Sequence, residues 1–295
     1  LKKFFIVMFN NLVKLKYTSL QLAYDIKKDF FNRKKNLDHN LLFISSLPKS
    51  GSTLIENIAS ILQYVDLKSS LLRNFNSKSA PEPHGINKEM ILSAPEKKLS
   101  YLKTHTDFNK SYTEILKFNK TKVIITYRDL RDVMISRYFH IMADKLHWQH
   151  NSISRLDFKS GFIESIECKN SRHPLKNFNN LHYYYYWIKN WKKEYKNYDY
   201  LMLKYENYVL NRTKFIEKIL SYLNQTEVGV KNIERKLDKK LNIIKKLKFE
   251  DRLKLPGDFK STYREGRIDN WKSIFDNEIS QKFLDLLPEP IDKIM

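Results

Sequence analysis

Cysteine is almost absent from this sequence. The chain of 295 residues has one, Cys168, so an internal disulfide is excluded. A single cysteine is typical of proteins from a reducing compartment, where thiols stay reduced. We therefore expect a cytoplasmic location. Internal repeats and low-complexity linkers are absent as well, and the length suits one large α/β domain with a sizeable core.

The sequence also lacks a long hydrophobic run. No stretch of about 18 uncharged apolar residues occurs, so no transmembrane helix is predicted. Residues 4–9 are apolar and follow two lysines, but no small-residue cleavage site comes after them. Leucines among lysines in residues 1–38 predict an amphipathic helix. We expect it to pack on the domain formed by residues 39–295; the alternative is peripheral contact with an anionic membrane surface.

Acidic residues are the minority among the charged ones. There are 33 Asp and Glu against 54 Lys and Arg, a formal net charge of +21. This balance favours anionic partners such as a nucleotide, an acidic glycan, anionic lipid or nucleic acid. A composition bias of the genome towards Lys, Asn and Ile explains the charge equally well. A basic nucleic-acid-binding protein stays an alternative, but its helix and zinc signatures are missing, so nucleic acid is not the expected partner.

The most informative segment is residues 41–54, LLFISSLPKSGSTL. An apolar run typical of a buried strand ends at a proline, a loop of small residues follows, and residues 54–62 have helical spacing. A strand, a tight loop and a helix in this order point backbone N–H groups and a helix N-terminus at a bound phosphate. The loop residues expected to meet the anion are Lys49, Ser50, Gly51, Ser52 and Thr53.

This loop differs from the standard P-loop. Its lysine lies two residues before its only glycine, and Ser52 occupies the position of the P-loop lysine. A P-loop kinase or NTPase would also need Mg²⁺ ligands, which are not evident, so that enzyme class is the alternative. An ordinary strand–turn–helix corner is the structural alternative. P-K-S-G-S-T after a strand resembles the 5′-phosphosulfate loop of sulfotransferases that use PAPS, 3′-phosphoadenosine 5′-phosphosulfate.

A second segment supports this resemblance. Residues 123–126 predict a strand, and Asp132 is expected to cap the helix that follows. In the sulfotransferase family the matching R-x-x-x-D-x-x-x-S pattern grips the 3′-phosphate, which implies this role for Arg128 and Ser136. Arginine suits it because its planar guanidinium makes paired bonds to phosphate oxygens. The alternative is a surface loop in which the charges of residues 128–132 pair among themselves.

A third segment lies near the C-terminus. Residues 262–272, TYREGRIDNWK, resemble the family's R-K-G-x-x-G-x-W-K, which closes over the 3′-phosphate. Glu265 replaces the family's lysine, so only its backbone would make the cofactor contact, and Asp269 replaces the second glycine. The alternative is a solvated charged turn. The matching residues are Arg264, Gly266, Trp271 and Lys272.

A candidate catalytic histidine lies between the first two motifs. Residues 99–105, LSYLKTH, predict a short strand that ends at a polar corner. Many soluble sulfotransferases carry K-[ST]-H here, and the resemblance implies that His105 is the general base. Lys103 lies two residues earlier and is expected on the same face. A structural histidine is the alternative. The resemblance further implies that Lys49 assists the leaving oxygen and that Ser136 restrains Lys49.

Several other positions follow from the same resemblance. Tyr205 matches the tyrosine of the family's Y-E pair, which touches the cofactor. Phe249 is the candidate for the aromatic residue beside the adenine, although Ile244 fits another alignment. The adenine-stacking tryptophan of the family is Leu54 here. The aromatic run in residues 181–191 predicts a helix that fills the core; stacking on a sugar or aryl acceptor is the alternative.

The three motifs occur in the family's order between residues 43 and 272. The sequence is therefore identified as a member of the PAPS-dependent sulfotransferases. This implies an α/β, P-loop NTPase-like three-layer fold with a central parallel sheet flanked by helices. The implied cofactor is PAPS, released as PAP, and no metal is expected. The acceptor would be the hydroxyl or amine of a small molecule, glycan or lipid, and the sequence is silent on its identity and on the oligomeric state.

Overall fold

The computed structural model describes residues 39–62, 65–70, 99–108, 113–114, 116, 121–168, 179–246 and 266–295. The predicted N-terminal helix in residues 1–38 lies outside these ranges, as do Phe249, Arg264 and Glu265. No helix in the described ranges is long and apolar enough to cross a membrane.

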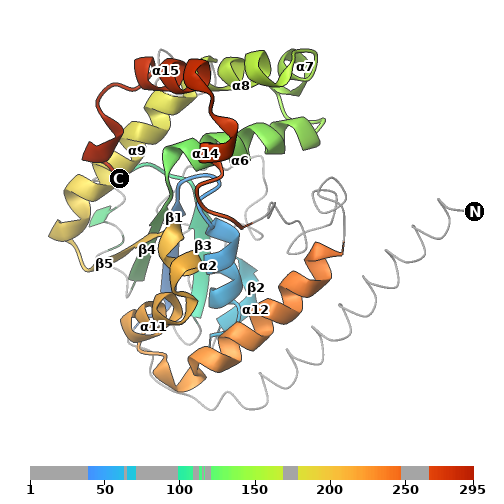
Figure 1. Ribbon diagram of the computed structural model, residues 1–295. Coiled ribbons are helices and arrows are strands. Elements are labelled where there is room, and N and C mark those ends of the chain that lie inside the picture. Colours follow the sequence, from blue (N-terminus) through green and yellow to red (C-terminus); the bar gives the residue numbers. More distant parts are fainter. Residues whose placement is uncertain are drawn as a thin grey trace, which may run out of the picture.

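A five-stranded parallel sheet forms the centre of the fold (Figure 1), and its strand order is β2-β3-β1-β4-β5. β1 pairs with β3 on one side and with β4 on the other, so the loops that follow these three strands leave the same edge of the sheet. Ligands of open parallel sheets bind at this kind of edge, where the strand order reverses. The strands are β1 Leu41–Ser46, β2 Val65–Ser70, β3 Leu99–Thr104, β4 Thr121–Tyr127 and β5 Tyr200–Lys204.

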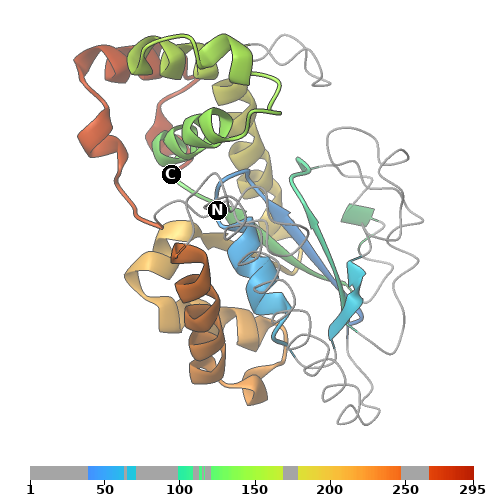
Figure 2. The same cartoon turned by 90° about the vertical axis from the view of Figure 1, so that its right-hand side faces the viewer.

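Helices cover both faces of the sheet (Figure 2). Along β1, Leu41 and Phe43 pack into one core and Leu42 and Ile44 into the other, because successive strand residues face opposite sides. Side chains of α6, α8, α9 and α15 share the first core, and those of α2, α11 and α12 share the second. The predicted three-layer fold is confirmed.

The helical elements complete this arrangement. The α-helices are α2 Ser52–Ala59, α6 Leu130–Ala143, α7 His150–Ile153, α8 Phe158–Glu167, α9 Asn180–Glu194, α10 Tyr205–Leu210, α11 Arg212–Tyr222, α12 Val230–Lys245, α14 Trp271–Ile274 and α15 Asn277–Asp285. Short 3₁₀ turns are η1 Tyr195–Asn197, η2 Thr226–Val228 and η4 Ile291–Lys293.

The predicted start of α6 was wrong. The helix begins at Leu130 and its N-cap is Asp129, whose carboxylate accepts a 2.9 Å hydrogen bond from the backbone N–H of Arg131. Asp132, the predicted cap, lies within the first turn. Asp129 has the non-helical backbone that a cap needs, so it takes this role three residues earlier. The carboxylate of Asp132 is therefore available for other contacts.

Between α6 and α9 the chain forms the short helices α7 and α8, and Asp157 caps α8. The aromatic helix is confirmed as a core element, because Tyr185, Trp187 and Trp191 of α9 are almost fully buried.

Candidate active site

The loop after β1 has the compact form that an anion site needs. Lys49 has a φ of 67° and Gly51 a φ of 92°, so the chain turns sharply through the left-handed region. Gly51 is also the N-cap of α2, and no side chain of the described residues caps this helix. The first-turn N–H groups of α2 thus lack a side-chain acceptor, as a phosphate-binding helix end requires.

The hydroxyl-bearing residues of this loop lie in different surroundings. Ser50 is buried, and its hydroxyl contacts the backbone carbonyls of Leu47 and Thr126, the latter at 3.0 Å. This hydroxyl therefore ties the loop to the end of β4. Ser52 and Thr53 are half-buried at the start of α2. The ammonium nitrogen of Lys49 is buried.

Tyr205 packs directly on this loop. A Cβ added to Gly51 would lie 2.7 Å from Cδ2 of Tyr205, so only glycine fits beneath the ring. The guanidinium of Arg128 lies over the ring of Tyr205, 4.8 Å from its centroid. Tyr205 thus joins the loop after β1 to the loop after β4, which places three sequence-predicted residues together.

His105 follows β3 at the same edge of the sheet. Its Nδ1 lies 2.7 Å from the backbone carbonyl oxygen of Ser46, at the end of β1. Because a carbonyl oxygen only accepts hydrogen bonds, Nδ1 carries the proton of the neutral ring. Nε2 is then the unprotonated nitrogen. This tautomer is the one in which Nε2 can accept a proton.

Two tryptophans of α9 hold the backbone at His105. The indole N–H of Trp187 donates to the carbonyls of His105 at 3.1 Å and Thr106 at 3.0 Å, and that of Trp191 donates to Thr106 at 3.3 Å. The hydroxyl of Ser45 donates to the same Thr106 carbonyl at 2.7 Å. The segment is therefore fixed from both the helix and the sheet.

Lys103 points towards α2. Its ammonium group forms an ion pair with the carboxylate of Glu56, and both side chains are about three-quarters buried. The sequence predicted that Lys103 lies near this edge of the sheet, but it did not predict that Glu56 is its partner. Glu56 restrains the ammonium group beside the helix whose N-terminus faces the loop.

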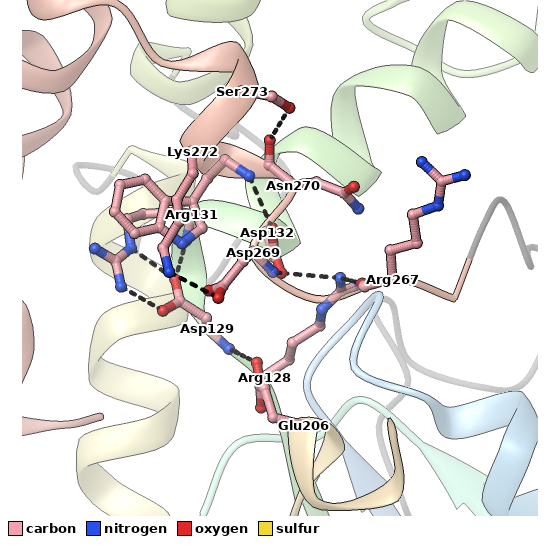
Figure 3. Close-up of polar contacts among 11 residues, drawn as sticks. Arg128, Asp129, Arg131, Asp132, Glu206, Arg267, Asp269, Asn270, Lys272 and Ser273 are labelled. Carbon is pink, nitrogen blue, oxygen red and sulfur yellow. Dashed lines mark hydrogen bonds and ion pairs between the residues drawn. The ribbon is translucent and has the colours of Figure 1, made fainter. Parts of the chain in front are cut away.

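Arg128 lies at the other side of the site and is 7% exposed. Its Nη2 donates to Asp132 Oδ2 at 3.1 Å and to the backbone carbonyl of Arg267 at 2.5 Å (Figure 3). Its Nε is buried and makes no hydrogen bond to the described part of the chain. Ser136 lies further along α6 and is half-buried. The charge pairing among residues 128–132, which was the alternative to a phosphate-binding role, therefore forms in part.

The C-terminal motif lies against α6. We call residues 266–272 the strap. Asp132 accepts hydrogen bonds from the backbone N–H of Asp269 at 2.9 Å and of Trp271 at 3.1 Å. Asp269, which replaces the family's second glycine, has a φ of 60°. Aspartate tolerates this left-handed conformation better than most residues, so the glycine-like turn is kept.

A second ion pair supports the strap. Nε and Nη2 of Arg131 donate to the carboxylate of Asp129 at 2.9 Å and 2.5 Å. The guanidinium held in this way lies 3.7 Å from the ring centroid of Trp271, which belongs to the strap. Burial is the largest single influence and lowers the pKa of Arg131, but the hydrogen bonds to Asp129 together with the negative charges of Asp129, Asp132 and Asp269 outweigh it, so the pKa is raised.

Three residues shape the site in ways that the sequence did not predict. Glu206 accepts a 2.9 Å hydrogen bond from the backbone N–H of Asp129, and burial raises the pKa of its carboxyl. Asp132 and Trp187 hold the strap and the histidine, respectively. The Y-E pair was the one available signal for Glu206. In the described ranges, no group of three or more His, Cys, Asp and Glu residues is arranged to hold a metal ion.

Known proteins with similar sequences are sulfotransferases. The chain matches the sulfotransferase domain model over residues 39–293. It is 24% identical over 279 residues to a flavonol 3-sulfotransferase from Flaveria bidentis, covering 85% of this chain and 82% of the relative.

Solved structures share the fold. A retinol dehydratase in complex with androsterone and the inactive cofactor PAP has a TM-score of 0.51 and 15% identity, covering 84% of this chain and 79% of that one. Mouse sulfotransferase SULT7A1 complexed with PAP has a TM-score of 0.50 and 16% identity, covering 84% and 83%.

The fold and the family match together define a sulfotransferase domain. The chain belongs to the sulfotransferase domain family. The predicted enzyme class, a PAPS-dependent sulfotransferase, is confirmed by this membership.

Proposed function

We propose that this chain moves a sulfuryl group from PAPS to an acceptor hydroxyl or amine, with His105 as the general base. The contact between His105 Nδ1 and the Ser46 carbonyl is the observation that carries the proposal. It selects the tautomer in which Nε2 takes the acceptor's proton, and it ties the base to β1, the strand that precedes the loop Lys49–Thr53.

The residues at this edge of the sheet fit PAPS. The uncapped start of α2 offers N–H groups to a 5′-phosphosulfate, together with the loop Lys49–Thr53. Arg128 has a buried Nε with no partner in the described ranges and suits the 3′-phosphate. When bound, PAPS supplies the activated sulfuryl group. The proposed cofactor-binding residues are Lys49, Ser50, Gly51, Ser52, Thr53, Arg128, Ser136, Tyr205, Phe249, Arg264, Glu265 and Gly266.

The side chains divide the chemical work. His105 removes the proton from the acceptor atom that attacks. Lys49 offsets negative charge that develops on the leaving side, and Lys103 supports it from β3. Ser136 is proposed to restrain Lys49 until an acceptor is present. Cations and N–H groups meet the charge of the ligand, so the proposal uses no metal.

The acceptor is proposed to be a small molecule, a glycan or a lipid. The related proteins have flavonol, androsterone and retinol in their names or complexes, and these are small organic molecules. The single cysteine, Cys168, agrees with a proposed cytoplasmic location.

Calorimetry with PAP, compared with ATP and Mg²⁺, tests the cofactor. We expect PAP to bind and ATP with Mg²⁺ to bind far more weakly. Preference for ATP would favour the kinase alternative instead.

Replacement of the histidine tests the base. We expect His105→Ala to lose sulfuryl transfer by at least about a hundredfold while PAP affinity is unchanged. His150→Ala is the matched control. Nδ1 of His150 also lies within hydrogen-bond distance of a backbone carbonyl, that of Ile141 at 2.9 Å, but His150 is in α7, away from the strand ends. Equal activity of His105→Ala and the control would reject the base assignment.

A further inference from the structure

One buried carboxylate joins Arg128 to the strap. Asp132 is 2% exposed and receives three hydrogen bonds, from Arg128 Nη2 and from the backbone N–H groups of Asp269 and Trp271. The two N–H donors lie 137 and 139 residues further along the chain. Figure 3 shows these contacts converging between α6 and the strap.

We propose that Asp132 is a positioning residue that fixes Arg128 and the strap 266–272 in one arrangement, so that the cofactor site exists before the ligand arrives. The consequence for PAPS rests on the function proposed above. Asp132 itself does not touch the cofactor in this proposal; it acts through the groups that it holds.

The geometry at Arg128 supports this role. Nη2 is held from two directions, by Asp132 and by the carbonyl of Arg267, and the guanidinium lies over the ring of Tyr205. Three contacts with three different segments leave the guanidinium plane little freedom. Nε of Arg128 has no partner in the described ranges, so it is the donor that this arrangement leaves available to a ligand.

The geometry of the strap supports it as well. The left-handed turn at Asp269 directs its N–H to Asp132 Oδ2, and α14 begins with the N–H of Trp271 on Oδ1. Each of the two carboxylate oxygens of Asp132 therefore accepts a hydrogen bond from the strap. Asparagine has one acceptor oxygen and turns an N–H₂ donor towards its neighbours, so it cannot serve all three donors.

Electrostatics and positioning predict opposite effects of removing this charge. A carboxylate beside an anion site repels the anion, so by charge alone Asp132→Asn would strengthen binding. If the carboxylate positions Arg128 and the strap, its loss weakens binding instead. The direction of the change therefore distinguishes the two explanations.

The first test is amide hydrogen exchange of the ligand-free protein. We expect Asp132→Asn to accelerate exchange in the 266–272 peptide by about tenfold, because asparagine keeps one acceptor oxygen and at least one of the two amides held by Asp132 loses its acceptor. Asp157→Asn is the matched control: it makes the same replacement at the cap of α8, where asparagine serves equally well. If the 266–272 peptide exchanges at the wild-type rate in Asp132→Asn, the proposal is overturned.

The second test is steady-state kinetics with PAPS. We expect the KM for PAPS to rise by about ten- to a hundredfold in Asp132→Asn, with kcat within about threefold of the wild type. A lower KM would mean that electrostatic repulsion dominates and would overturn the positioning role. A fall in kcat alone would overturn it too.

The wild type supplies a test that needs no variant. If Asp132→Asn does not fold, PAP added to the wild type must slow exchange in the 266–272 peptide, because ligand binding and the held strap stabilise each other. PAP that binds without slowing exchange would overturn the inference. If PAP does not bind at all, the proposed function fails, whereas the Asp132 contact is still judged by exchange in the ligand-free protein.

Discussion

The indole N–H of Trp187 donates to the backbone carbonyl of His105 across 3.1 Å and shares that hydrogen with the carbonyl of Thr106 at 3.0 Å. Trp187 is fully buried in α9, and His105 follows β3 at the edge of the sheet. A core helix thus fixes the backbone of the proposed base. The aromatic run of α9 serves the site through packing and hydrogen bonding.

Replacing this tryptophan should impair the chemical step. Trp187→Phe keeps an aromatic ring but leaves the His105 carbonyl without its buried donor, at a cost of about 1–3 kcal/mol in stability. We expect kcat to fall about tenfold with PAP affinity unchanged, since the base is less well placed. Trp191→Phe is the control, because Trp191 donates to Thr106 alone. Equal kcat losses in the two variants would contradict this role.

Gly51 should tolerate no side chain. Gly51→Ala adds a Cβ 2.7 Å from Tyr205 at a φ of 92°, so both a clash and backbone strain oppose it. We expect a loss of at least about 3 kcal/mol in unfolding free energy. Gly229→Ala is the control: its φ is 75° and no atom of the described residues lies within 4 Å of the added Cβ, so about 1–2 kcal/mol of strain remains. Similar losses in chemical denaturation would argue against the clash.

Asp269 should be replaceable by the family's glycine. Asp269→Gly gives up an exposed ion pair with Lys272 at 2.8 Å, worth about 0–1 kcal/mol, and relieves the strain of a φ of 60°. We expect the melting temperature to stay within about 3 °C of the wild type. Asp269→Val should lower it clearly, because a β-branched residue disfavours this conformation. If valine is as stable as glycine here, the left-handed turn is absent in solution.

Asp107 should destabilise the fold as it ionises. Burial raises its pKa to about 6, partly offset by hydrogen bonds from the Phe108 N–H and Asn190. The folded state therefore holds a proton that the unfolded state releases, and stability falls as pH rises from about 4 to 6. Asp107→Asn should be more stable than the wild type above pH 6, by at most about 3 kcal/mol, and no different near pH 3.5.

The Asp107 prediction is tested by the difference in unfolding free energy between Asp107→Asn and the wild type at each pH. The pKa of His147 is lowered to about 4, chiefly by burial, so its own effect raises stability over a similar pH range. Urea titrations of both proteins from pH 3.5 to 7.5 cancel this contribution. A stability difference independent of pH would show that Asp107 titrates normally.

Local patterns predicted the elements that carry the site. The loop after β1, the strand that leads to His105 and the loop that carries Arg128 are each encoded within about ten consecutive residues, because apolar spacing and turn residues act over that range. The start of α6 was misplaced because Asp129 and Asp132 are both good caps, and the choice depends on which one has a non-helical backbone.

Partners that come from distant segments could not be predicted in this way. Glu56 and Lys103 carry no mutual signal in the sequence, and their ion pair exists because α2 packs beside β3. Likewise, the close contact of Tyr205 with Gly51 requires that the end of β5 lies beside the loop after β1.

The sequence by itself determined the class of enzyme and the candidate residues for anion binding, since motif residues and strand–loop–helix corners are local properties. Only the tertiary structure decided how those residues are held. Asp132 binds N–H groups 137 and 139 residues away, and Trp187 reaches His105 across 82 residues. A hydrogen bond acts over about 3 Å, so such partners meet only after helices and sheet have packed.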